Sequence, residues 1–253
     1  MPTLPYVTSV TDAAGVTTVE FATAAHNSLP ARELAALAAA ITAAGEEEAC
    51  RVIVLRSGGD RTFCAGASFD ELIAVGTEAE GRAFFSGFAA VINAMRRCPR
   101  LIVGRVQGKA VGGGVGLISA CDLAYATTFA SVKLSELAIG IGPFVIGPAV
   151  ERKVGKAGFS EMALRAGEWF GAAYAKTRGL YTEVVADAGA LDEAVGTQAA
   201  ALAGYHREAT AEMKRVLWAG TEDWGALLGE RAAISGRLVT RPWTRAALAR
   251  LKG

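Results

Sequence analysis

The chain has 253 residues, 52% of them hydrophobic and 20% charged, which is enough apolar material for one large domain. Its formal net charge of +1 argues against a nucleic-acid-binding or membrane-binding surface, and no apolar run is long enough to span a membrane without interruption. Four cysteines without a Cys-x-x-Cys pair fit reduced thiols better than disulfides or a zinc site, so we expect no bound metal.

The first half of the chain alternates strand and helix patterns. No signal-peptide pattern precedes them, so we expect a cytoplasmic protein. Strand patterns cover residues 6–10, 16–21, 51–56 and 101–106, and helical patterns cover residues 31–44 and 77–97. Ser28 is a candidate N-cap for the first helix, which we expect to end at Gly45. The run at 51–56 is almost continuously apolar, which indicates a strand covered on both faces.

Two loops of small residues follow apolar strands. The first, residues 57–68, is long, and such loops often carry function. The second is the glycine triplet at residues 112–114, which leads into a short buried helix at 117–121. If the two strands are neighbours in a sheet, the loops lie at the same edge, and one backbone N–H from each can bind a single carbonyl oxygen. The alternative is that the glycines only permit tight packing of the helix on the sheet.

The second half of the chain is predominantly helical. After strand patterns at 123–126 and 130–134, helices are predicted at residues 149–165, 172–177, 190–203, 208–219, 223–237 and 242–251, interrupted by one strand pattern at 181–185. This order predicts an α/β fold with largely parallel sheets, followed by a helical region. The last helices carry more large apolar residues than one core needs, which predicts self-association; these are Leu217, Trp218, Trp224, Leu227, Leu228, Ile234, Leu238 and Trp243.

Several polar residues are interpreted as structural. His26 and His206 have no evident serine or cysteine partner, so neither is expected to be catalytic. Asp122 directly follows the short buried helix and is expected to accept structural hydrogen bonds. Asp70 and Glu71 are expected in the first turn of a helix that follows the first loop.

The two loops and the residues after them resemble the crotonase superfamily, the enoyl-CoA hydratases and isomerases of fatty acid metabolism. The resemblance extends from about residue 16 to the C-terminus. It is carried by Phe63-Cys64-Ala65-Gly66-Ala67, Gly112-Gly113-Gly114 with Ala120-Cys121-Asp122, Ser135-Glu136 ahead of Gly140 and Pro143, and residues 175–180. It implies a crotonase-like spiral of repeated β-β-α units over residues 1–190. It also implies a helical C-terminal trimerisation region over residues 191–253, and assembly as a trimer or a dimer of trimers.

The resemblance also implies an active site for an acyl-CoA thioester. By position, the N–H groups of Ala67 and Gly113 are oxyanion-hole donors, which hold the thioester oxygen as an enolate develops. Ala65 is expected against the adenine of coenzyme A, and Arg61 near one of its phosphates. Glu136 matches the second of the two glutamates of the family's hydratases and is expected to be the acid and base. Coenzyme A belongs to the substrate, so we expect no separate cofactor.

Two positions depart from the hydratase pattern. Gly116 stands in place of the first glutamate, and Phe144 stands where a glycine commonly helps to hold the water. Because glycine cannot transfer a proton, activation of water by two carboxylates is not available in its usual form. We expect both residues, together with Gly66 and Gly112, to line the substrate site.

Several interpretations therefore stay open. With Glu136 as the sole acid and base, the protein either isomerises a double bond or hydrates one by a one-glutamate variant of the reaction. Alternatively, it is a non-catalytic or weakly active acyl-CoA-binding homologue. The pair Ser135-Glu136 is also compatible with a simple helix start, in which the acid lies near the positive end of the helix dipole.

Overall fold

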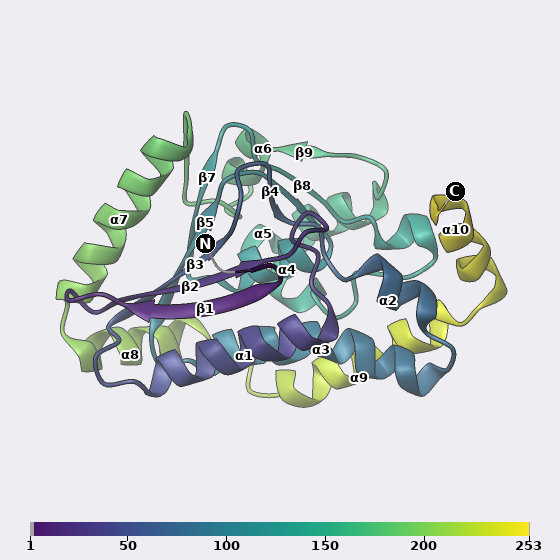
Figure 1. The fold of residues 1–253 in the computed structure, drawn as a ribbon, viewed down its shortest axis with the longest axis horizontal. Coiled ribbons are helices and arrows are strands. Elements are labelled where there is room, and N and C mark those ends of the chain that lie inside the picture. The colour runs from purple at the N-terminus through teal and green to yellow at the C-terminus, as the bar shows by residue number, and fades with distance from the viewer. Residues whose placement is uncertain (1–2, 253) are drawn as a thin grey trace.

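The strands of the computed structural model, which describes residues 3–252, form two sheets (Figure 1). These strands are β1 (Tyr6–Thr11), β2 (Val16–Ala22), β3 (Val52–Ser57), β4 (Thr62–Cys64), β5 (Leu101–Val106), β6 (Lys109–Val111), β7 (Leu123–Thr127), β8 (Ser131–Lys133), β9 (Phe170–Gly171) and β10 (Glu183–Val185). The larger sheet has the order β1-β2-β3-β5-β7-β10, and the smaller has the order β4-β6-β8-β9. Pairing is parallel except between β1 and β2 and between β8 and β9.

The chain alternates between the two sheets. Each of β3, β5 and β7 in the larger sheet is followed by a short strand of the smaller sheet, β4, β6 and β8 respectively. Helical segments come next: α2 (Phe69–Ala74) and α3 (Glu78–Arg97) after β4, α4 (Gly113–Ala120) after β6, and a 3₁₀ helix (Glu136–Ile139) with α5 (Gly147–Leu164) after β8. The expected α/β fold of repeated β-β-α units is confirmed. β4, β6 and β9, of two or three residues each, are missing from the predicted elements.

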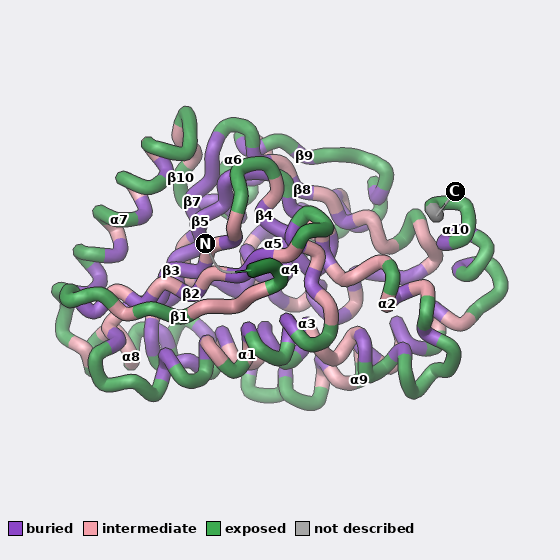
Figure 2. Tube along the Cα trace, in the orientation of Figure 1, coloured by how far each residue is buried: buried purple, intermediate pink, exposed green. Residues whose placement is uncertain are grey.

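Alternate residues of the larger sheet face two different layers. Val52 and Val54 of β3 pack in a cluster with α7 (Ala188–Gly204), which covers one face of the sheet. Ile53 and Leu55 face the main core, which contains residues of α3, α4 and α5. Both faces of β3 are therefore covered, as its continuous apolar run predicts. Figure 2 shows the buried positions gathered along the central strands and α4, with the outer side of α7 exposed.

The helix α1 (Ala31–Glu46) begins without the predicted cap. Pro30 occupies the N-cap position and Ser28 lies outside the helix, so the prediction for Ser28 is wrong. Instead, Oε2 of Glu71 accepts a hydrogen bond of 2.9 Å from the N–H of Ala31. Glu71 lies in the first turn of α2, as predicted. A carboxylate of α2 therefore caps α1, a long-range contact that no local pattern indicates.

The C-terminal helices pack against the rest of the chain. They are α8 (Arg207–Leu217), α9 (Trp224–Val239) and α10 (Pro242–Lys252), and the short helix α6 (Ala172–Thr177) precedes β10. Trp218, Trp224 and Leu228 are buried in the main core, so they are not surplus apolar surface as the sequence led us to expect. Leu217 and Trp243 remain about half exposed. The expected division at residue 190 falls inside α7.

A buried ion pair joins α8 to the larger sheet. Asp122 directly precedes β7, and its Oδ2 lies 3.1 Å from Nζ of Lys214, with the two side chains only 5% and 2% exposed. The same carboxylate accepts hydrogen bonds from the N–H of Ile102 at 2.7 Å and from Nε1–H of Trp218 at 2.8 Å. Lys214 also donates to the carbonyl of Arg100 at 2.7 Å. The predicted structural role of Asp122 is confirmed.

The cysteines are all buried and free. Burial raises the pKa of the Cys64 and Cys121 thiols to about 12, so both are protonated at neutral pH. Within residues 3–252, no helix is both long enough and apolar enough to cross a membrane.

Replacing Asp122 by asparagine should strongly destabilise the fold. Asp122→Asn leaves Lys214 charged in the core without its counter-charge, so we expect the free energy of unfolding to fall by about 3–5 kcal/mol in a denaturant titration. Glu212→Gln is the matched control, because Glu212 pairs with Arg215 at the exposed surface of the same helix. The control should cost less than about 1 kcal/mol. Equal losses in the two variants would contradict a special role for the buried pair.

Candidate active site

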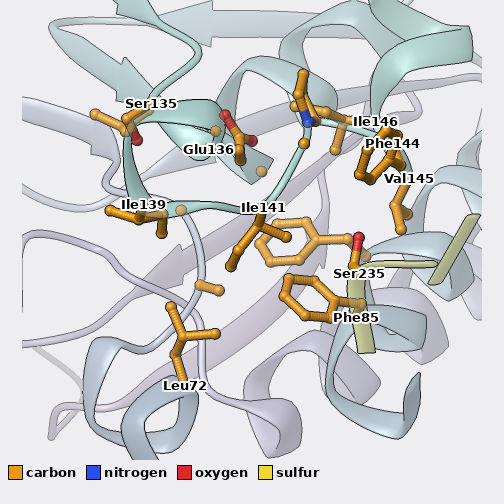
Figure 3. Close-up of a pocket in the computed structure, with 18 of the residues that line it drawn as sticks. Leu72, Phe85, Ser135, Glu136, Ile139, Ile141, Phe144, Val145, Ile146 and Ser235 are labelled. Atoms are coloured by element: carbon orange, nitrogen blue, oxygen red, sulfur yellow. The ribbon is translucent and has the colours of Figure 1, made fainter. Parts of the chain in front are cut away.

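A cavity of about 180 Å³ lies where the chain leaves β4 and β6 and meets the 3₁₀ helix, α2, α3 and α9 (Figure 3). Its lining is mostly apolar and includes the aromatic residues Phe69, Phe84, Phe85, Phe88 and Phe144. The polar side chains among the lining residues are those of Ser135, Glu136 and Ser235, and of these only Glu136 titrates. Among residues 3–252, no three His, Cys, Asp or Glu side chains lie together as metal ligands.

Two loops meet at the cavity, as the sequence predicts. β4 and β6 are parallel neighbours, so the residues that follow them emerge at the same edge of the smaller sheet. A Cβ on Gly114 would lie 2.5 Å from the carbonyl oxygen of Cys64, and a Cβ on Gly66 would lie 3.6 Å from the nitrogen of Gly113. Gly66 and Gly112 also have positive φ angles of 87° and 50°. The glycines therefore both permit tight packing and bring two stretches of backbone to the cavity.

The two predicted donors have N–H groups without a protein acceptor among residues 3–252. Leu29 and Ala67 form an isolated β-bridge, in which the N–H of Leu29 donates to the carbonyl of Gly66 at 2.8 Å and the N–H of Ser68 donates to the carbonyl of Leu29 at 3.1 Å. The N–H of Ala67 takes part in neither hydrogen bond. Gly113 is the first residue of α4, where an N–H has no partner within the helix. Within residues 3–252 neither N–H has an acceptor, and both residues line the cavity. The dipole of α4 adds partial positive charge at Gly113.

Glu136 begins the 3₁₀ helix and directs its carboxyl group toward the glycine triplet. Its Oε1 lies 2.9 Å from the position that a Cβ on Gly112 would occupy. Its Oε2 is buried and has no hydrogen-bond partner among residues 3–252. Burial raises the pKa of this carboxyl to about 7, although its own backbone N–H acts in the opposite direction. A carboxyl that titrates near neutrality can both accept and return a proton.

The interpretation of Ser135-Glu136 as a simple helix cap has no support in the contacts. Ser135 makes no side-chain capping hydrogen bond, and the 3₁₀ helix that follows has only four residues. A capping acid is stabilised by backbone N–H groups, whereas one carboxyl oxygen of Glu136 is buried without a described donor. A group held at such an electrostatic cost is typical of a functional site.

Gly116 lies next to Ile146 rather than in the cavity lining. Although Gly116 belongs to α4, it is not among the residues that line the cavity. A Cβ on Gly116 would lie 2.5 Å from Cγ2 and 2.8 Å from Cβ of Ile146, which itself lines the cavity. The side chain of Ile146 therefore lies between Gly116 and the cavity, and a role for Gly116 in the substrate site stays a prediction.

The structure places most of the other predicted site residues in the cavity lining, whereas Arg61 lies apart from them. Those that line the cavity are Ala65, Gly66, Ala67, Gly112, Gly113, Glu136 and Phe144. Arg61 is exposed and lies in a separate surface groove with His26 and Asn27. Its contact with a phosphate of coenzyme A stays a prediction.

Three residues that shape the site were missed in the sequence. Asn27 donates from Nδ2 to the carbonyls of Gly58 and Thr62, both at 2.8 Å, and so anchors the loop that leads into β4. Ile146 and Ser235 line the cavity from α5's N-terminal end and from α9. No local motif signals any of these roles, because each depends on how distant segments pack.

The chain is similar in sequence and in fold to known proteins. Residues 11–230 match the family model described as enoyl-CoA hydratase/isomerase. The chain is 30% identical over 180 residues to the peroxisomal Delta(3,5)-Delta(2,4)-dienoyl-CoA isomerase of Arabidopsis thaliana. The aligned region covers 65% of this chain and 63% of that protein. The chain is 34% identical over 117 residues to the mitochondrial methylglutaconyl-CoA hydratase of Rattus norvegicus, which covers 46% of this chain and 37% of that protein. The matches thus span less than two thirds of either relative.

The similarity to a solved structure extends over more of the chain. A crystal structure of an enoyl-CoA hydratase from Mycobacterium smegmatis superposes with a TM-score of 0.80 and 30% sequence identity. The superposition covers 90% of this chain and 89% of the other.

The contact with Ile146 predicts that Gly116 tolerates no side chain. Gly116→Ala would force a Cβ against Ile146, so we expect the free energy of unfolding to fall by about 1–3 kcal/mol. Gly196→Ala on α7 is the control, because a Cβ there meets no atom within 4 Å and should raise stability by about 0.5–1 kcal/mol. If both variants were stabilised in thermal and denaturant unfolding, Ile146 would have to be free to move away.

Proposed function

The chain belongs to the enoyl-CoA hydratase/isomerase family, and we propose that it moves a carbon–carbon double bond along an acyl-CoA thioester, with Glu136 as its single acid and base. The observation that carries this proposal is the carboxyl of Glu136, whose Oε2 is buried without a partner among residues 3–252 in a mostly apolar cavity. Two backbone N–H groups without acceptors lie in the lining of the same cavity, and they support an oxyanion hole.

The N–H groups of Ala67 and Gly113 bind the thioester carbonyl oxygen. When a proton leaves the carbon next to this carbonyl, negative charge accumulates on the oxygen as an enolate forms. Donors that already face this oxygen stabilise the charge without reorganising, which is often the largest contribution to catalysis. The positive end of α4 at Gly113 adds to the effect.

Glu136 carries the proton between two carbons. As a carboxylate it removes a proton from C2 of a 3-enoyl thioester, and the electrons of the broken bond extend the 3,4-double bond into a dienolate. The protonated carboxyl then returns the proton to C4, and the double bond lies between C2 and C3. No atom is gained or lost, and a pKa of about 7 suits both the removal and the return.

The surroundings of Glu136 favour this reaction over hydration. Addition of water requires a group that holds and activates the water, and a second carboxylate would serve. Among the lining residues that the structure describes, Glu136 is the one side chain that titrates. Ile146 fills the space in front of Gly116, and Phe144 also lines the cavity with an apolar side chain. An apolar site also strengthens the electrostatic interactions within it once a bound acyl chain has displaced the water.

Glu136→Gln should abolish turnover and leave acyl-CoA binding nearly intact. Glutamine keeps the size of the side chain but cannot accept the proton, so we expect kcat for isomerisation of a 3-enoyl-CoA to fall on the order of a hundredfold or more. Because the carboxylate is the form that removes the proton, kcat/KM of the wild type should rise up to a pH of about 7 and level off above it. Proton NMR in deuterium oxide measures both the product and exchange at C2.

Two controls accompany this variant. Glu71→Gln changes a glutamate of α2 that does not line the cavity and should leave kcat unchanged.

Unfolding gives a second readout that needs no turnover, since the raised pKa of Glu136 means that the folded wild type must bury a charge above pH 7. Between pH 4.5 and pH 8, the free energy of unfolding of Glu136→Gln should rise by about 3 kcal/mol relative to that of the wild type. Wild-type hydration without isomerisation contradicts the proposed reaction, and a lack of deuterium exchange identifies a non-catalytic acyl-CoA binder.

We also propose that the protein is a homo-oligomer, a trimer or a dimer of trimers. Its C-terminal helices leave Met213, Val216, Leu217 and Trp243 between 49% and 63% exposed, which is apolar surface that a partner subunit can cover. Light scattering at micromolar protein should give a mass that is a multiple of three times the 26.1 kDa of one chain. The mass of a single chain would contradict this.

A further inference from the structure

The side chain of Ser235 lines the same cavity as Glu136. The residue is only 1% exposed, yet it lines the cavity from α9, on the side away from Glu136 (Figure 3). A buried helical serine usually donates to a carbonyl one turn earlier, as Ser119 does to Val115 at 2.8 Å. No such hydrogen bond joins Ser235 to the carbonyl of Arg231, and Phe85 lies beside Ser235 in the cavity lining (Figure 3).

The position of Ser235 is set by two rigid helices rather than by a loop. α9 packs along α3, and glycine occupies both sides of the contact next to Ser235. A Cβ on Gly81 would lie 2.7 Å from Cα of Gly236, and a Cβ on Gly236 would lie 2.4 Å from the nitrogen of Arg82. This close approach holds the serine beside the turn of α3 that carries Phe84 and Phe85 into the cavity.

We propose that Ser235 is a specificity-determining residue that hydrogen-bonds to an uncharged oxygen, a hydroxyl or keto group, on the acyl chain of the substrate. This inference rests on the proposed function. A purely hydrocarbon chain that filled the cavity would displace water from this hydroxyl and leave it unpaired, which is unfavourable. An oxygen on the chain restores the hydrogen bond, so the site discriminates in favour of oxygenated acyl groups.

The charge of the cavity limits what this oxygen can belong to. No lysine or arginine is among the lining residues that the structure describes, and the titratable side chain there is the acid Glu136. A carboxylate on the acyl chain would lose its hydration without gaining a counter-ion, and it would repel Glu136 in its charged form. The proposal therefore excludes dicarboxylic acyl groups and specifies a neutral oxygen.

The test compares the binding of unreactive, saturated acyl-CoA thioesters in matched pairs. One member of each pair is unsubstituted, and the other carries a single hydroxyl or keto group at one carbon from C4 outward. Calorimetry on the wild type should show, for at least one pair, a preference for the oxygenated member that Ser235→Ala reduces by about tenfold. Ser86→Ala is the matched control on α3, because its exposed hydroxyl donates to the carbonyl of Arg82 and should leave the preference unchanged.

The outcomes separate this inference from the proposed function. If Ser235→Ala and the wild type show the same ratio of affinities for every pair, the serine serves packing alone and the inference is overturned. Turnover of an unsubstituted 3-enoyl-CoA, measured on the same samples, then shows whether the proposed function still stands. Ser235→Cys keeps the side-chain size with a weaker donor and should give an intermediate preference. A dicarboxylic thioester that binds more tightly than its parent through Ser235 also overturns the inference.

Discussion

At Gly112, Gly113 and Gly114 the backbone runs closer to its neighbours than a side chain would allow. A Cβ on these residues would lie 2.9 Å from the carboxyl of Glu136, 2.2 Å from the ring of Phe88 and 2.5 Å from the carbonyl of Cys64 respectively. The three contacts involve different segments: the 3₁₀ helix, α3 and the end of β4. Without this approach, the first N–H of α4, the loop after β4 and the carboxyl of Glu136 would not border one cavity. The geometry of the site thus depends on three consecutive residues that have no side chain.

The apolar lining of the cavity has one effect on Glu136 and another on an acyl chain. Burial among aromatic and aliphatic side chains raises the pKa of Glu136 and leaves one of its oxygens without a partner among residues 3–252. This arrangement lowers the stability of the fold above neutral pH, which is a common cost of a functional site. The same walls offer an acyl chain a place to bury its surface. For the isomerisation that we propose, a single acid group would be sufficient, because that reaction moves a proton within the substrate and activates no water.

Sequence patterns predicted the parts of this fold that depend on neighbouring residues. The apolar run of β3 identifies a strand buried on both faces, and the positions of Ala67, Gly113 and Glu136 in recognisable motifs anticipate a shared cavity. Contacts between distant segments could not be read in this way. The sequence shows that Gly116 lacks a side chain, but not that Ile146 fills the space. It also shows apolar C-terminal helices, but not that Trp218 and Trp224 turn inward, since amphipathic patterns do not specify which surface a helix faces.

The ion pair between Asp122 and Lys214 has a consequence for the order in which the chain folds. Asp122 lies between α4 and β7, near the middle of the chain, whereas its partner belongs to α8. Until α8 has left the ribosome, the carboxylate would have to be buried without its counter-charge, or the strand after it would have to stay partly hydrated. The final packing around Asp122 is therefore completed only after α8, which begins at Arg207, has been synthesised.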